Sequence, residues 1–119
     1  MITTFRLLTA VGTLSLLSIM WPRSSDAVEY IQHQDWEKVA SAVSVLQIPS
    51  LQRVVGSYES GKDMIIMIRY PGGDEGNEWA IELRDWLVSF GIAMEDIELQ
   101  PGSGMPGAIA IDAESRAVN

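Results

Sequence analysis

The chain has 119 residues, of which 8 are Lys or Arg and 16 are Asp or Glu, so its formal net charge at pH 7 is −8. A surface of that sign repels nucleic acid phosphates and anionic lipids, and neither is expected as a partner. There is no cysteine, which excludes disulfides, thiol catalysis and cysteine-based zinc sites. We expect no cofactor and no metal.

Residues 1–27 have the pattern of a secretory signal peptide. An apolar run over residues 7–21 follows a basic start, and small residues at 25–27 suit a signal peptidase. The run is shorter than the roughly 20 residues that cross a bilayer, although an uncleaved anchor is the alternative. We predict cleavage after Ala27, a periplasmic or secreted location, and no stable membrane insertion after cleavage. The remaining chain is expected to form one small domain over residues 28–112, with a flexible tail at 113–119.

The first half of this domain is predicted to contain a helix and a β-hairpin. Between Val28 and Leu46, apolar residues recur at steps of three and four, which is typical of one helix face; they are Trp36, Val39, Ala40, Val43 and Leu46. The segments Arg53–Tyr58 and Met64–Tyr70 are strand-like and are joined by a short polar link with a glycine.

The second half shows one strong helix between strands. From Glu78 to Phe90 the apolar residues form one stripe that includes Trp79 and Trp86, and we expect this stripe to pack on the sheet. Gly91 suits a left-handed C-terminal cap, with Ile92 folding back onto the last turn as in a Schellman motif.

Two further strands, Asp96–Gln100 and Ala108–Asp112, follow this helix. The order α-β-β-α-β-β predicts an α+β fold, a two-layer sandwich with two helices on one face of a four-stranded mixed sheet. The passage from Met64 to Gln100 would be a right-handed crossover if its two strands are parallel and share one sheet.

The segment from Ile68 to Gly104 resembles the β-α-β half of the OmpA-like peptidoglycan-associating domain. The matching residues are Asp74 and Gly76 in the loop, Ala80, Leu83, Trp86 and Leu87 on the helix, Gly91 and Ile92 at its exit, and Ile97 in the next strand. The resemblance implies peptidoglycan binding in a bacterial envelope. Trp79 stands where that family places an arginine that holds the diaminopimelate carboxylate.

The glycine-rich acidic loop before the helix is the first candidate site, with Asp74, Glu75, Asn77 and Glu78 as ligand-binding residues. Acidic residues without a lysine argue against phosphate, and their spacing does not match an EF-hand Ca²⁺ loop. A ligand carrying an ammonium group is electrically suitable. The alternative is purely structural: Asp74 caps the helix while Glu75 and Glu78 favour its positive end.

Three classes of function are compatible with these features. The first is an exported non-enzymatic module that binds an envelope component or a protein partner. The second is an assembly protein that uses its acidic face or a sheet edge, at Arg53–Tyr58 or Ala108–Asp112. The third is a small hydrolase built on His33, with Asp35 and with Ser41 or Ser44, although no G-x-S-x-G elbow is present. The first is the leading prediction.

Overall fold

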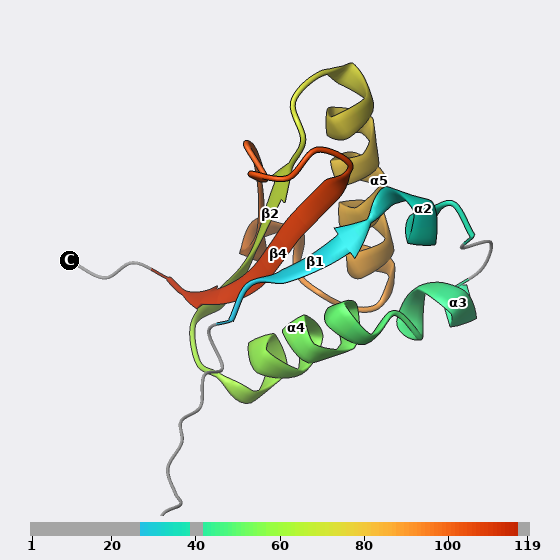
Figure 1. The fold of residues 1–119 in the computed structure, drawn as a ribbon. Helices are drawn as coiled ribbons and strands as arrows, with labels where there is room; N and C mark the ends of the chain where they lie inside the picture. The colour runs from blue at the N-terminus through green and yellow to red at the C-terminus, as the bar shows by residue number, and fades with distance from the viewer. Residues whose placement is uncertain (1–26, 39–41, 117–119) are drawn as a thin grey trace, which may run out of the picture.

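The computed structural model describes residues 27–38 and 42–116 (Figure 1). In chain order the elements are β1 (Glu29–Gln32), α2 (His33–Trp36), α3 (Ala42–Leu46), α4 (Pro49–Ser60), β2 (Met64–Tyr70), α5 (Asp74–Ser89), the 3-10 helix η3 (Met94–Asp96), β3 (Ile97–Pro101) and β4 (Ala108–Ser115).

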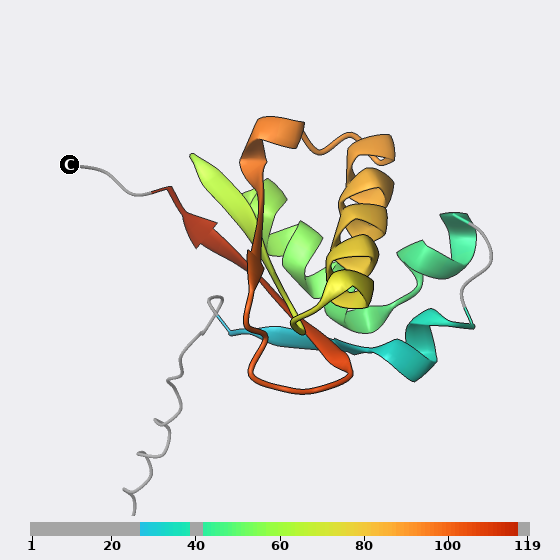
Figure 2. The same ribbon diagram turned by 90° about the horizontal axis from the view of Figure 1, so that it is seen from above.

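The molecule has two layers, with the helices on one face of the sheet (Figure 2). The strand order is β1-β4-β2-β3. β4 is antiparallel to both β1 and β2, whereas β2 and β3 are parallel neighbours. This confirms the predicted two-layer α+β class and the four-stranded mixed sheet. The strands on either side of α5, β2 and β3, are parallel neighbours in that sheet.

The strand register assigns residues to the two faces of the sheet. Ile66 pairs with Ile97 and Ala113, and Ile68 pairs with Ile111. Because side chains alternate along a strand, these residues share the face that the helices cover. That face and the apolar stripes of α4 and α5 form one core, whose largest fully buried side chains are Ile31, Val45, Leu51, Ile66, Ile68, Leu83, Leu87, Ile109 and Ile111.

The helix predicted over Val28–Leu46 is wrong, because this segment begins with a strand. β1 pairs with β4 and buries Ile31 in the core. Val43 and Leu46 are 64% and 48% exposed, so they are not part of a buried helix face. Val39 and Ala40 lie outside the described residues.

The hairpin strand predicted at Arg53–Tyr58 is also wrong, because the segment lies within α4. Pro49 occupies the first turn of this helix, where its missing N–H costs nothing. Leu51 and Val54 are buried, and the partly buried Val55 and Tyr58 continue that stripe at helical spacing. The β-branched valine pair favours a strand locally, but burial of one helix face decides the outcome.

The second half follows the prediction closely. Gly91 has φ +104°, its N–H donates to Val88 O at 2.9 Å, and the Ile92 N–H donates to Leu87 O at 3.1 Å. This is a Schellman motif. The predicted tail at 113–119 needs correction, since β4 continues to Ser115 and Ala113 is buried.

Candidate functional site

The acidic loop forms the first turn of α5 rather than a separate binding loop. Gly73 is the N-cap residue, with φ +97°, and the described part of the chain shows no side-chain cap hydrogen bond at this helix end. The prediction that Asp74 caps α5 is therefore wrong. Asp74 and Glu75 still lie in the first turn, where their charges favour the positive end of the helix dipole.

The structure separates the four predicted ligand residues. Asn77 Nδ2 donates to Tyr70 Oη at 3.1 Å, whereas Glu75 and Glu78 line two different hollows. Asp74 is exposed and lines neither of those hollows. Across the described parts of the chain, no three His, Asp or Glu side chains are grouped to hold a metal ion.

The first hollow lies beside the start of α5. It has a volume of about 250 Å³ and is lined by His33, Pro71, Gly72, Glu75, Gly76, Trp79 and Gly107. The His33 and Trp79 rings meet edge to face with centroids 5.0 Å apart. Trp79 Nε1 is buried and has no hydrogen-bond partner in the described structure. The hollow thus combines one carboxylate, one imidazole and an aromatic wall.

His33 does not lie in an arrangement that supports the hydrolase alternative. Its Nδ1 atom is 3.4 Å from the Glu37 carboxylate, and both side chains are largely exposed. The hollow beside it contains no serine among its lining residues. Ser41 lies outside the described residues.

The second hollow is a shallow groove along the outer stripe of α5. Its volume is about 360 Å³, and it is lined by Glu78, Ile81, Glu82, Asp85, Trp86 and Ser89. These residues recur at three and four residue steps, so they lie on one helix face. Trp86 stacks on Phe90 with ring centroids 5.9 Å apart and an interplanar angle of 28°.

Two of the three carboxylates in this groove already have partners. Glu82 Oε1 accepts a hydrogen bond from Trp36 Nε1 at 3.2 Å. Asp85 Oδ1 accepts one from Arg84 Nη2 at 3.1 Å, which offsets part of its charge. These carboxylates suit a guanidinium or ammonium group, because hydrogen bonds between opposite charges are the stronger ones, and Trp86 is partly exposed beside them.

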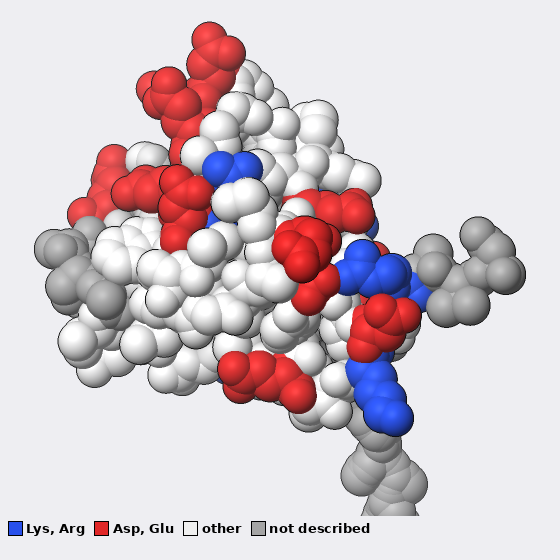
Figure 3. Space-filling view, turned by 180° about the vertical axis from the view of Figure 1, so that it is seen from behind, with Lys and Arg blue, Asp and Glu red and all other residues white. Residues whose placement is uncertain are grey.

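Acidic side chains also dominate the surroundings of the groove. Viewed from behind, the side of the molecule away from β1 carries more acidic than basic groups (Figure 3). In the sequence, the groove corresponds to polar residues at helical spacing, Glu78, Glu82, Asp85 and Ser89.

A scan against protein-family models finds no matching family, and searches of curated proteins and of solved structures find no match either. Within residues 27–38 and 42–116, no helix has both the length and the apolar character needed to cross a membrane.

Proposed function

We propose that the chain from Val28 onward is a non-enzymatic binding module of the bacterial cell envelope, and that it takes its partner on the outer stripe of α5. The location rests on the signal peptide expected at residues 1–27. The binding mode rests on one observation, the groove in which Glu78, Glu82 and Asp85 lie beside Trp86.

The groove fits a partner that presents ammonium or guanidinium groups on an extended surface. Peptidoglycan stem peptides carry such groups, and so do basic segments of envelope proteins. Each exposed ion pair contributes only about 0.2–1 kcal/mol, so binding requires several contacts along the helix. Such binding weakens as salt rises, because salt screens exposed charges.

Co-sedimentation with isolated peptidoglycan sacculi tests this proposal, with beads carrying a lysine-rich peptide measured in parallel. The described core lies within residues 27–116, so a chain starting at Val28 retains the domain. The double variant Glu78→Gln, Asp85→Asn removes two groove charges and leaves the Glu82 contact to Trp36 intact. We expect it to lose retention on the matrix that holds the unmodified chain.

The matched control is Glu59→Gln, Glu95→Gln, which changes the net charge equally at exposed sites on α4 and η3. Equal losses in both double variants would mean that only net charge matters, and the groove would be rejected. Retention on sacculi favours an envelope polymer, and retention on peptide beads alone favours a protein partner. If neither matrix retains the unmodified chain, the proposal is wrong. The variant Asp74→Ala tests whether the first turn of α5 also contributes to retention on either matrix.

A further inference from the structure

β1 has a free edge whose hydrogen-bonding groups can be assigned. Among the strands that the structure describes, it pairs only with β4, because the strand order places it at the end of the sheet. The His33 N–H donates to Gly107 O at 2.8 Å, directly after the last paired residues. Hydrogen-bonded pairs alternate in an antiparallel ladder, so Ile31 faces β4 and the backbone groups of Tyr30 and Gln32 face outward.

The two edges of the sheet differ in how well they resist pairing with another strand. At the β3 edge, Glu98 is exposed and Pro101 ends the strand. Charges and prolines are common protections of an exposed edge. β1 has no proline and no lysine, and its one charge is neutralised because Arg53 Nη2 lies 2.9 Å from Glu29 Oε1.

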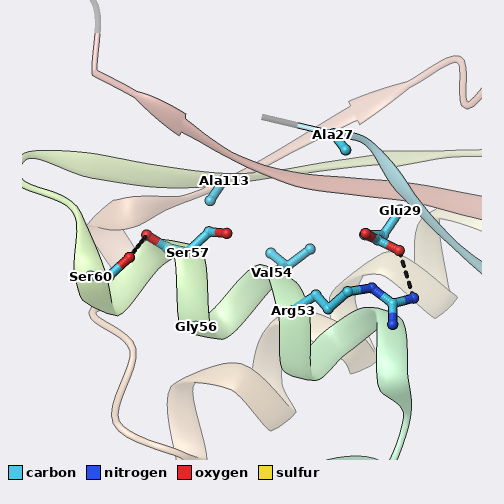
Figure 4. A pocket seen from close by; sticks show the side chains of 8 residues that line it. All are labelled: Ala27, Glu29, Arg53, Val54, Gly56, Ser57, Ser60 and Ala113. Atoms are coloured by element: carbon cyan, nitrogen blue, oxygen red, sulfur yellow. Dashed lines mark hydrogen bonds and ion pairs between the residues drawn. The ribbon is translucent and has the colours of Figure 1, made fainter. Parts of the chain in front are cut away.

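A groove accompanies the free edge of β1 along α4 and α3. One end is a hollow of about 350 Å³ between α4 and the strands, shown in Figure 4; its lining includes Glu29, Arg53 and Ser57. The other is a hollow of about 440 Å³ whose lining includes Tyr30 and Gln32 of β1 and also Arg53. Arg53 lines both hollows, so they adjoin each other beside the strand.

The charged residues that line this groove balance one another: Glu29 and Asp35 are acidic, and Lys38 and Arg53 are basic. Val28, directly before β1, and Tyr30 within it are both 43% exposed. The face of the molecule that is seen from behind carries more acidic than basic groups (Figure 3).

We propose that the free edge of β1 pairs with β1 of a second copy of this chain, antiparallel and about a two-fold axis at Ile31. Identical strands that pair in this way form an isologous interface. Tyr30 of each copy then lies opposite Gln32 of the other, and their outward backbone groups exchange hydrogen bonds. Two copies of so acidic a chain repel each other over most of their surfaces, and the neutral surface around Glu29 and Arg53 lets them approach.

Sedimentation velocity over a wide range of concentrations tests the pairing, using the chain from Val28 with any tag at the C-terminus. The decisive variant is Gln32→Pro, because proline removes an N–H that faces solvent in the single copy. The φ of Gln32 is −79°, which proline adopts without strain. We expect the unmodified chain to dimerise as its concentration rises, and Gln32→Pro to remain monomeric throughout that range.

Gln32→Ala is the matched control, since it removes the side chain and keeps the N–H; it should dimerise like the unmodified chain. An unmodified chain that stays monomeric at every concentration overturns the proposal, as does a folded Gln32→Pro that still dimerises. If circular dichroism shows Gln32→Pro to be unfolded, Tyr30→Glu replaces it. That variant places two acidic side chains on the same face at diagonal positions of the pair, where the residues are about 7–8 Å apart, and undiminished dimerisation would likewise overturn the proposal.

Discussion

At the scale of single residues, close packing and burial assign roles that residue type alone does not reveal. A Cβ at Gly76 would lie 1.7 Å from Pro71 O, so only glycine lets α5 begin this close to the end of β2. Asp112 is 5% exposed on the face of the sheet that no helix covers, with its Oδ1 atom 3.3 Å from Arg69 Nη1. For both residues we can therefore predict whether a substitution raises or lowers the stability of the fold.

We expect Gly76→Ala to destabilise the fold by about 1–3 kcal/mol, because the backbone at Pro71 must move. Inside a helix the same replacement normally stabilises by roughly 0.5–1 kcal/mol. Gly56 in α4 is the matched control, since a Cβ there meets nothing within 4 Å. Urea unfolding of both variants is the measurement, and a stabilised Gly76→Ala would contradict the close contact.

The raised pKa of Asp112 makes the stability of the folded state depend on pH. Burial, and then the neighbouring Glu114 carboxylate, raise this pKa from 3.8 to about 6, although Arg69 acts in the opposite direction. Because the folded state holds the proton more tightly than the unfolded state, Asp112 lowers stability as pH rises from about 4 to about 6.

We therefore predict that Asp112→Asn gains stability relative to the unmodified chain across that pH window, by about 1–3 kcal/mol in total. The change follows from removing a buried charge that the folded state disfavours. Urea unfolding at several pH values measures it. A stability difference that stays constant through the window would show that Asp112 does not titrate there.

At the scale of elements, the two ends of α5 are built differently. Its C-terminus is closed by the Schellman hydrogen bonds at Gly91 and Ile92. Its N-terminus has no side-chain cap and depends on the first-turn carboxylates Asp74 and Glu75. The outer stripe of α5 thus belongs to a long helix that is fixed firmly at one end.

Asp74→Ala is expected to destabilise the protein by only about 0.3–1 kcal/mol, since it removes a dipole interaction and no capping hydrogen bond. Thermal unfolding at low and high salt measures the effect, which should shrink as salt screens the charge. A loss near 2 kcal/mol that salt does not change would indicate a cap in solution instead.

At the scale of the whole molecule, the strand order determines which backbone amides of the sheet are protected from hydrogen exchange. β4 and β2 are paired on both sides, whereas β1 and β3 are edges. The Arg116 N–H donates to Asp63 O at 2.8 Å, and its side chain pairs with Asp63 and Asp96, so the end of β4 is tied to the turn after α4 and to η3.

Amide hydrogen exchange of the dilute monomer should show this arrangement. We predict the slowest exchange in β4 and β2, and alternation within β1: slow at Ile31, whose N–H faces β4, and fast at Tyr30 and Gln32, whose N–H groups face solvent. NMR-detected exchange resolves these amides. Strong protection of Tyr30 in the monomer would mean that the register of β1 is different.

The sequence by itself determined the elements whose signals are local. The strand-like segment Met64–Tyr70 is β2, the apolar stripe that ends before Gly91 specifies most of α5, and the strands expected at Asp96–Gln100 and Ala108–Asp112 form most of β3 and β4. From these elements the two-layer class follows, because each apolar face must be buried.

Only the tertiary structure decided the first half of the domain and the candidate sites. β1 is too short to carry a reliable period, and it is a strand because β4 offers its backbone a partner and the core accepts Ile31. Likewise, His33 meets Trp79 and Trp36 meets Glu82 across more than forty positions of chain. Such contacts depend on how elements pack together, and a local pattern contains no information about its distant partner.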